Sequence, residues 1–314
     1  MTSASGPAAA SIVICSRGRP ELLGDAVGSV LAGALVPREL VVVDQSAEPN
    51  LELSAMGEVR GCEVRYLHSA TAGLSRGRNI GLRAATQPVA VLIDDDMLVE
   101  ASWLAELLAG RPDSAFAVAT GRVLAAPSEG AAGVVPPAAL VERDEAAVYR
   151  GPQPIDVVPG ANVALPRETV LGLGGYDERL GAGTRFASAD DNDIGERLLA
   201  AGCEVHHVPS AVTLHRAWRT RPELIRLRWH YGRGKGAFYA KHAHLKDRRM
   251  LHRALGDLGI RMRRAAGSIV RRPKAAVGEL ISVAGVVSGA LEWLLCERLP
   301  AAMRHSDKSD ERDA

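Results

Sequence analysis

The sequence has few cysteines, and nothing in their arrangement suggests a covalent scaffold. Its 314 residues include 4 Cys. These are far apart, show no CxxC pair and lie mostly within apolar patterns: Cys15, Cys62, Cys203 and Cys296. This spacing favours free, buried thiols in a reducing compartment. A disulfide framework is therefore not expected.

A targeting leader and two common phosphate-binding signatures are also lacking. The opening MTSASGPAAASIVICSRGRP has no charged region ahead of an apolar core, and its apolar run is too short for a signal peptide or membrane anchor. The stretch after the first expected strand, SRGRPELLG, lacks GxGxxG, and no Walker A sequence occurs. We therefore expect a cytoplasmic protein that is neither a Rossmann dinucleotide binder nor a P-loop protein.

Charge is nearly balanced overall but unevenly placed. The formal net charge is +1, and the 47% hydrophobic content is enough to bury a substantial core. The region His215–Lys274 is rich in Arg and Lys and holds only Glu223, Asp247 and Asp257 against them. The overall charge therefore says little about partners.

Apolar runs alternate with a helical pattern in the first third of the chain. Compact β-rich runs occur at Ser11–Cys15, in ELVVVDQS, at Val64–Leu67 and in PVAVLIDDD, while Glu21–Ala34 has a helical period. Continuous apolar strands separated by helices predict an α/β protein with a mainly parallel sheet covered on both faces. In such sheets ligands bind at the carboxyl ends of the strands.

Three carboxylates, Asp94, Asp95 and Asp96, end the fourth apolar run. Ionised carboxylates this close repel one another, and burial makes the repulsion worse unless a cation or strong hydrogen bonds compensate. Two of them can reach a divalent ion jointly, and Mg²⁺ or Mn²⁺ favours oxygen ligands shared with phosphates. A solvated turn or a helix N-cap is the alternative.

A second acidic group, Asp190, Asp191 and Asp193, directly precedes a helical pattern. One acid suffices to cap a helix, and the surplus suggests a general base held near a substrate hydroxyl. His215 follows the apolar strand VTLH, where the α/β rule places ligands, although a lone His is more often structural.

A Gly flanked by two Arg, in GLSRGRNIG, precedes another helix. Glycine permits close approach of the backbone, and Arg76 and Arg78 can bind phosphate oxygens in a forked geometry. A diphosphate site and an ordinary surface turn both remain open for this segment.

In this order the segments resemble the inverting nucleotide-sugar glycosyltransferases of family 2, which have the GT-A fold. SIVICSRGRPELLGDAVGSVL resembles the opening strand and helix, ELVVVDQS the second strand, GLSRGRNIGLRAA the Arg-Asn segment and VLIDDD the DxD motif. GANVALPRETVLGLGGYDERLG resembles the acceptor-side segment, and ADDNDIGERLLAAG the ED motif with its helix. The resemblance covers residues 10–240, about three quarters of the chain.

The resemblance implies a nucleotide-sugar donor site. Asp44 resembles the acid that binds the nucleotide base, with Ser16 and Arg17 beside it, and Arg78 resembles the donor-binding arginine. UDP is favoured by its frequency in the family, with GDP and dTDP as alternatives.

The resemblance also implies a metal site with Mn²⁺ or Mg²⁺. Asp94 and Asp96 match the outer acids of DxD, the first near the ribose and the second on the metal that bridges the diphosphate. Asp95, between them, joins the donor-binding set, and His215 resembles the histidine that completes the metal site in many members.

The candidate catalytic base is Asp191, which aligns with the aspartate of the ED pair. Two departures matter. Asp190 stands where the family usually has Glu, which shortens its reach, and Gln45 stands where many members have a second Asp.

The C-terminal region interleaves cations with aromatics at Trp218, Trp229, Tyr231, Phe238 and Tyr239. An anionic surface such as lipid headgroups, a nucleic-acid strand, and a solvated helical face with packed aromatics are the alternatives, with nucleic acid disfavoured. The apolar Leu280–Leu295 run is shorter than a spanning helix, so we expect a packed or interfacial helix on a peripheral protein.

These observations together predict a cytoplasmic, metal-dependent inverting glycosyltransferase with a carbohydrate or lipid-linked acceptor, in cell-envelope or polysaccharide synthesis. The alternative is a non-catalytic module of the same fold that holds nucleotide or glycan. The expected parts are a disordered lead, a GT-A domain, a basic and amphipathic helical region and a polar tail, at residues 1–9, 10–217, 218–300 and 301–314.

Overall fold

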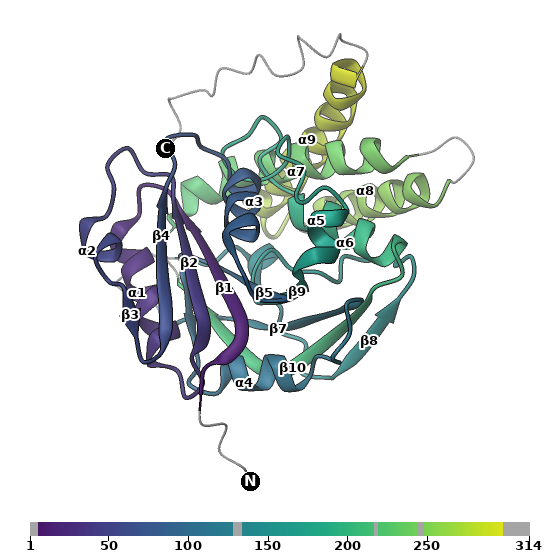
Figure 1. Ribbon diagram of the computed structural model, residues 1–314. Helices are drawn as coiled ribbons and strands as arrows, with labels where there is room; N and C mark the ends of the chain where they lie inside the picture. The colour runs from purple at the N-terminus through teal and green to yellow at the C-terminus, as the bar shows by residue number, and fades with distance from the viewer. Residues whose placement is uncertain (1–5, 128–133, 217–218, 244–247, 298–314) are drawn as a thin grey trace. The chain divides into compact units, whose positions relative to one another are not determined.

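A computed structural model of the chain describes residues 6–127, 134–216, 219–243 and 248–297 (Figure 1). Its strands are β1 (Ala8–Ser16), β2 (Pro37–Asp44), β3 (Glu58–Val59), β4 (Cys62–His68), β5 (Val89–Asp94), β6 (Met97–Val99), β7 (Ala117–Ala125), β8 (Ala147–Arg150), β9 (Val163–Pro166) and β10 (Glu204–His215). Its helices are α1 (Pro20–Ala32), α2 (Leu51–Ser54), α3 (Leu74–Ala84), α4 (Trp103–Ala109), α5 (Arg167–Gly172), α6 (Asp190–Ala200), α7 (Arg221–His242), α8 (Arg249–Ser268) and α9 (Pro273–Glu297), with a 3-10 turn at Pro137–Ala139. The α/β class expected from the sequence is confirmed.

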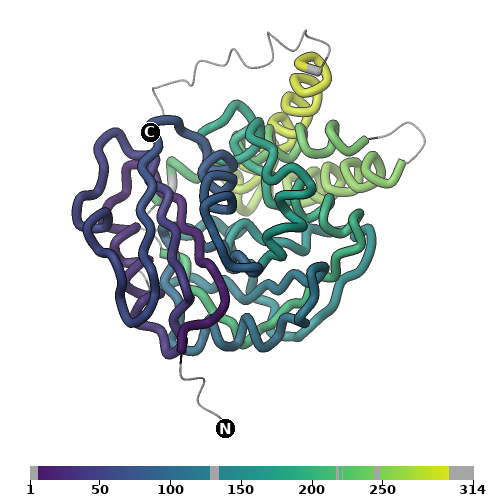
Figure 2. Tube along the Cα trace, in the orientation of Figure 1, coloured from purple at the N-terminus to yellow at the C-terminus, as the bar shows by residue number. Residues whose placement is uncertain are grey.

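A single sheet of ten strands runs through the described residues, in the order β3-β4-β2-β1-β5-β9-β7-β10-β6, with β8 paired to β10. The strands β4, β2, β1 and β5 are parallel neighbours, as the apolar runs predict. The short β9 then runs antiparallel to both β5 and β7, so the sheet is mainly parallel but mixed. Figure 2 follows the same path along the Cα trace.

The strands are apolar throughout because both faces of the sheet are covered. On β1, Ile12 and Ile14 belong to the core under α1 and α4, whereas Val13 and Cys15 belong to the core under α3. Successive strand residues point to opposite faces, which explains this division. The cysteines Cys15, Cys62 and Cys203 are free and buried, and Cys296 is free and partly buried.

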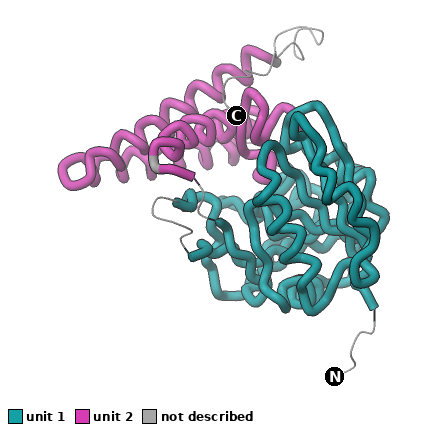
Figure 3. Tube along the Cα trace, turned by 90° about the vertical axis from the view of Figure 1, so that its left-hand side faces the viewer, with its two compact units in different colours: residues 1–177, 194–218 teal, residues 178–193, 219–314 magenta. Residues whose placement is uncertain are grey.

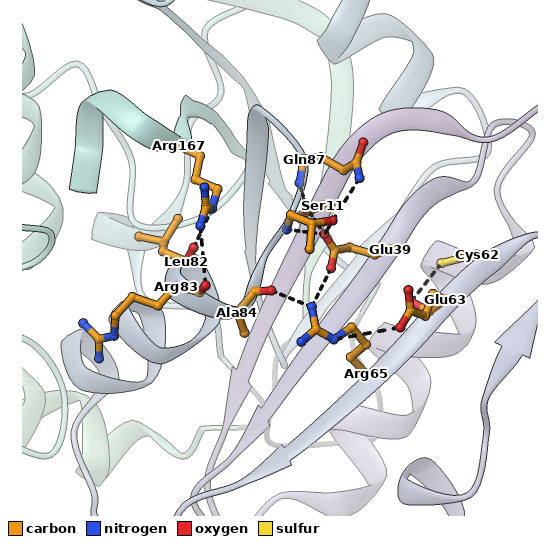
Figure 4. A network of polar contacts seen from close by, with 11 residues as sticks. Ser11, Glu39, Cys62, Glu63, Arg65, Leu82, Arg83, Ala84, Gln87 and Arg167 are labelled. Atoms are coloured by element: carbon orange, nitrogen blue, oxygen red, sulfur yellow. Dashed lines mark hydrogen bonds and ion pairs between the residues drawn. The ribbon is translucent and has the colours of Figure 1, made fainter. Parts of the chain in front are cut away.

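One buried carboxylate joins three strands at the amino end of the sheet (Figure 4). Glu39 on β2 accepts hydrogen bonds from Ser11 Oγ at 2.7 Å and from Thr86 Oγ1 at 2.6 Å, and Arg65 lies 3.2 Å from its other oxygen. Arg65 also donates to the carbonyl of Ala84 at the end of α3. These contacts fix β1, β2 and β4 against the helix that crosses them.

Two compact units make up the chain (Figure 3). The first holds Met1–Asp177 and Ile194–Trp218, and the second holds Glu178–Asp193 and Arg219–Ala314. The second unit therefore combines the C-terminal helices with a segment from the middle of the sequence. The expected boundary between residues 217 and 218 stays a prediction, and Trp218 and the tail 301–314 lie outside the described residues.

Helices α7 and α9 pack closely because glycines line their contact. A Cβ built on Gly236 would lie 2.0 Å from the carbonyl oxygen of Val286, and one on Gly289 would lie 2.0 Å from that of Arg233. Ion pairs connect the same helices, Arg228 with Glu279 at 3.1 Å and Arg233 with Glu292 at 2.6 Å. On α7, Phe238 and Tyr239 are buried, whereas Trp229 and Tyr231 are half-buried.

Candidate active site

The register of the parallel strands brings four polar residues to one edge of the sheet. Ser16 at the end of β1 pairs with Asp44 of β2, and Asp44 pairs with His68 of β4. On the other side Cys15 pairs with Asp94 of β5. The carboxyl ends of β1, β2, β4 and β5 therefore meet where the α/β rule places a ligand.

The acid triplet forms a tight turn between β5 and β6. Asp94 ends β5, Asp95 and Asp96 form the turn, and Met97 begins β6. β6 pairs antiparallel with the end of β10, and the Arg216 N–H donates to the carbonyl of Asp96 at 2.9 Å. This pairing brings His215, which is distant in sequence, beside the acids.

Asp95 is fully buried and held from the end of β1. Its carboxylate accepts a hydrogen bond from Ser16 Oγ at 2.5 Å and forms an ion pair with Arg19 at 2.8 Å. Burial raises the pKa of Asp95 to about 7, although Arg19 lowers it. Arg19 also lies 3.6 Å from Asp96, so one guanidinium neutralises two acids of the triplet.

Arg78 forms a corresponding ion pair with Asp94. Its guanidinium lies 3.0 Å from Asp94 Oδ1, donates to the carbonyl of Gly160 at 2.5 Å and rests 5.3 Å from the ring centroid of Tyr176. Burial raises the pKa of Asp94, Arg78 lowers it, Asp96 raises it again, and the net pKa is above its ordinary value. The chain's own arginines therefore compensate only part of the cost of holding these carboxylates together.

His215 turns its second ring nitrogen, Nε2, toward the acid turn. Its Nδ1 lies 3.0 Å from the carbonyl oxygen of Arg216, which only accepts, so Nδ1 carries a proton and donates it. Nε2 then faces Asp96 Oδ1 at 3.8 Å. In the neutral ring Nε2 has a lone pair, as a metal ligand requires.

This pair of donors fits a divalent ion shared with a substrate. Two ligands that are each about 2.1 Å from one ion lie about 3–4 Å apart, which matches the separation of His215 Nε2 and Asp96 Oδ1. Across the residues that the structure describes, no group of three or more His, Cys, Asp or Glu side chains is arranged to hold an ion. The remaining ligands would be diphosphate oxygens and water, the arrangement that Mg²⁺ favours.

Asp44 forms a second polar centre at the end of β2. It accepts hydrogen bonds from the Ser46 N–H at 2.9 Å and from the Tyr66 hydroxyl at 2.7 Å. Burial, followed by the hydrogen bond to Asp44, raises the pKa of Tyr66 to about 12, so Tyr66 stays a donor. Gln45, where many family members have an acid, donates to the carbonyl of Thr71 at 2.6 Å, while Arg17 is exposed.

The second acidic group begins α6 in a strained setting. Ala189, the residue before the helix, has φ of 67°, a left-handed conformation that a non-glycine residue adopts at a cost of about 1–2 kcal/mol. Asp190 is buried, and Asp191 is half-buried and accepts from the Asn192 N–H at 2.9 Å. The left-handed turn at Ala189 sets the direction in which the chain enters α6, where these acids lie.

Asp193 is a structural anchor rather than an exposed acid. Its side chain is 0% exposed, and its Oδ1 lies 2.6 Å from Lys241 Nζ and 2.8 Å from His242 Nε2 at the end of α7. Lys235, six residues before Lys241 on α7, donates to Asn192 Oδ1 at 2.9 Å. The start of α6 is thereby tied to α7 within the second unit.

The structure gathers eight of the ten predicted residues at the strand ends of the first unit: Ser16, Arg17, Asp44, Arg78, Asp94, Asp95, Asp96 and His215. Asp190 and Asp191 belong to the second unit. The sequence prediction included Arg19 among the residues after the first strand but gave it no role, and it did not include Tyr66. A cation just after a strand was a usable signal for Arg19, whereas nothing in the sequence marks Tyr66, whose role depends on strand pairing.

Known proteins share this architecture. The mannosyltransferase PcManGT from Pyrobaculum calidifontis, solved with GDP-Man and Mn²⁺, superposes with a TM-score of 0.59 at 14% identity, over 92% of this chain and 88% of that one. GalNAc-T7, solved with UDP, GalNAc and Mn²⁺, gives a TM-score of 0.52 at 19% identity, over 77% and 52% of the two chains. These likenesses concern the fold, which is the GT-A fold of glycosyltransferases.

Sequence comparison supplies the family. The model of "Glycosyltransferase like family 2" matches residues 7–232, and the chain belongs to this family. It is 27% identical to a glucosyl-dolichyl phosphate glucuronosyltransferase of Haloferax volcanii, over 68% of this chain and 71% of that protein. It is also 27% identical to a pre-mycofactocin glycosyltransferase of Mycobacterium tuberculosis, over 57% of this chain but only 37% of the relative's length.

Proposed function

We propose that the protein is a metal-dependent inverting glycosyltransferase that uses a nucleotide-sugar donor, with UDP as the favoured nucleotide. One observation carries the proposal: the turn Asp94–Asp96 holds adjacent carboxylates in a buried setting, where burial raises the pKa values of Asp94 and Asp95, and His215 Nε2 lies 3.8 Å from Asp96. Such a site is costly without a cation and fits a divalent ion that shares its ligands with a diphosphate.

Residues at the strand ends would hold the donor. Asp44, with Ser16 and Arg17 nearby, would bind the nucleotide base. Asp94, with Asp95 beside it, would bind the donor near its ribose. Arg78, 3.0 Å from Asp94 and buried against Tyr176, would bind donor oxygens through its guanidinium. Asp96 and His215 would hold the metal, which when bound supplies positive charge against the leaving diphosphate.

The acceptor step belongs to Asp191 in this proposal. Its carboxylate would take the proton from the acceptor hydroxyl while that oxygen forms a bond to the anomeric carbon. The bond from the anomeric carbon to the diphosphate breaks on the opposite side, and the electron pair leaves with the nucleoside diphosphate, so the configuration inverts. Asp190 would support Asp191, and the Asp193 anchor would keep the start of α6 in place.

The proposed acceptor is a carbohydrate or a lipid-linked sugar, in cell-envelope or polysaccharide synthesis. The relative from Haloferax volcanii is named for a dolichyl phosphate substrate, which supports the lipid-linked option. We place the protein in the cytoplasm as a peripheral protein on the inner face of the membrane. The helix α9 is long and apolar enough to cross a membrane by length and composition, with a mean hydropathy of 1.6 over an 18-residue window within Pro273–Cys296.

Two substitutions separate the roles of the acidic groups. Asp96→Asn should weaken Mn²⁺-dependent UDP binding about tenfold or more, because it removes one charged ligand. Asp191→Asn should leave UDP binding unchanged and reduce release of UDP from a reactive donor by about 10²-fold or more, because it removes only the base. Calorimetry with UDP and MnCl₂, and a UDP-release assay over a panel of nucleotide sugars, measure both.

The exposed Asp113→Asn is the matched control and should change neither reading. Undiminished turnover in Asp191→Asn would contradict the assignment of the base. Tight UDP and Mn²⁺ binding, with no UDP released from any donor, would instead favour the non-catalytic module.

A further inference from the structure

The connection between α8 and α9 exposes an apolar tip. Ile269 is 61% exposed and Val270 is 89% exposed, both directly after α8 ends at Ser268. Exposed cations flank the pair on both sides along the chain: Arg263, Arg264, Arg271, Arg272 and Lys274. Isolated surface aliphatics are ordinary, but two adjacent ones bordered by five exposed cations form a defined feature. We call these seven residues the basic tip.

Helix α9 continues from the basic tip with one face that nothing described covers. Its exposed apolar residues lie three, four or seven positions apart, as one face of a helix requires: Val277, Leu280, Val287, Leu291 and Leu294. The opposite face holds Gly285 and Gly289 and packs against α7. The charges Glu279 and Glu292 are paired with arginines of α7, so no charge stands among the five exposed residues.

The charge around the tip is strongly one-sided. Residues 248–274 contain nine Lys and Arg, with Asp257 as the single acid, and Asp257 is paired with Arg261 at 3.1 Å. A bilayer with anionic lipids offers negative headgroups at the level of the cations and hydrocarbon just beneath for the aliphatic pair. The exposed cations and the exposed aliphatic pair of the basic tip therefore match an anionic bilayer.

Nucleic acid fits this surface less well. Single strands bind through cations interleaved with stacking aromatic rings. Three large rings of this unit are buried: Phe238, Tyr239 and Trp293, which is 3% exposed and packs against Phe186 at 5.4 Å. Trp229 and Tyr231 on α7 are half-buried. The exposed apolar residues of the tip are aliphatic and offer no ring for a base.

We propose that the basic tip docks the protein on an anionic bilayer, with Ile269 and Val270 entering the headgroup boundary and the flanking cations contacting lipid phosphates. The ion pairs of α9 with α7 favour a helix that lies along the interface, because a spanning helix would carry Glu279 and Glu292 into hydrocarbon. The purpose of this docking rests on the proposed function, because docking would bring the enzyme to a lipid-linked acceptor.

Vesicle sedimentation of the full chain tests the proposal. The protein should pellet with vesicles of phosphatidylcholine and phosphatidylglycerol at low salt, stay in solution with phosphatidylcholine alone, and be released by high salt. Arg271→Glu with Arg272→Glu should weaken binding tenfold or more. Ile269→Ser with Val270→Ser should also weaken it and leave the remaining binding more salt-sensitive, since only the electrostatic part is left.

The matched controls are Arg38→Glu with Arg83→Glu, which changes the charge equally at exposed positions of the first unit, and Leu51→Ser, which removes a leucine that is 74% exposed. Both controls should bind vesicles like the wild type. Thermal melting and UDP binding of each variant confirm that the fold is kept. UDP binding and sedimentation are separate measurements. A wild type that docks on vesicles but does not bind UDP would therefore count against the proposed function alone.

Three outcomes would overturn the docking proposal. The first is failure of the folded wild type to pellet with anionic vesicles. The second is vesicle binding that survives an alkaline carbonate wash, which would indicate a spanning helix. The third is an oligonucleotide that binds the wild type and is lost in the tip variants while vesicle binding is unchanged.

Discussion

At the scale of single residues, two arginines neutralise part of the charge of the acid turn. Arg78 compensates Asp94, and Arg19 compensates Asp95 and Asp96. Arg19 and the proposed divalent ion would therefore compete for the same carboxylates. Because the Arg19 side chain is 30% exposed, its contribution is moderated by solvent.

Arg19→Met tests this competition. In EDTA the variant should melt at a lower temperature than the wild type, because the buried acids lose a partner at a cost of about 1–3 kcal/mol. Adding MnCl₂ should then raise its melting temperature by more than it raises that of the wild type. Differential scanning fluorimetry measures both shifts, with Arg38→Met as an exposed control. A smaller response to Mn²⁺ in the variant would show that Arg19 assists the ion instead.

The acid triplet was predictable from the sequence, but its internal counter-ions were not. Three acids after an apolar run stand out in any single sequence. The pairing of Arg19 with Asp95 spans 76 residues and depends on the register of β1 against β5, in which Cys15 lies opposite Asp94. Local sequence carries no information on that register, so the neighbouring Arg17 seemed equally suitable.

At the scale of elements, the parallel strands were predictable because a strand that is buried on both faces consists of a continuous run of apolar residues. The direction of β9 was not, since VALP is apolar in either orientation and its antiparallel pairing with β5 is decided by distant partners. No structure was predicted from the sequence for the segment Met97–Val99. It becomes a strand only because β10 pairs with it.

Glu39→Gln tests the clamp that joins β1, β2 and β4. Burial alone would raise the pKa of Glu39, but hydrogen bonds from Thr86 and Ser11, with the contribution of Arg65, lower it below its usual 4.5. The charged form therefore stabilises the fold above pH 4.5, and this stabilisation disappears as the pH falls through the lower folded pKa. The variant should lose about 1–3 kcal/mol at neutral pH.

The difference between wild type and variant should shrink on acidification, because glutamine does not titrate. Urea unfolding at several pH values measures it. Glu63→Gln is the control, since its carboxylate is 69% exposed and 4.0 Å from the same Arg65. An equal loss of stability in both variants would argue that the clamp has no special role.

Gly289→Ala tests the contact of α7 with α9. The new methyl group would lie 2.0 Å from a backbone oxygen, so the helices must separate, at a cost of about 1–3 kcal/mol or more. Gly256→Ala on α8 meets nothing within 4 Å and should stabilise its helix by about 1 kcal/mol. Thermal melting of the two variants should therefore move in opposite directions. Equal shifts would mean that the packing is looser than described.

At the scale of the whole molecule, the sequence suggested a catalytic domain followed by a helical appendage. The sharp change to basic composition after residue 216 supports that division, and composition is what a single sequence reports best. The contacts divide the chain differently, because Glu178–Asp193 belongs to the same compact unit as the C-terminal helices. Composition cannot reveal this, since Leu180 and Phe186 look like ordinary core residues until their partners are known.

A chain that ends at residue 218 should therefore fail as a minimal catalytic domain. Leu180 and Phe186 would lose Ala237 and Trp293, against which they are buried, and the 0% exposed Asp193 would lose both Lys241 and His242. An unpaired buried carboxylate alone costs about 3–5 kcal/mol. Size-exclusion chromatography and thermal melting should show aggregation or a much lower transition. A chain that ends at residue 297 keeps every contact described and should behave like the full chain, whereas a monodisperse 1–218 fragment with an unchanged transition would restore the simpler division.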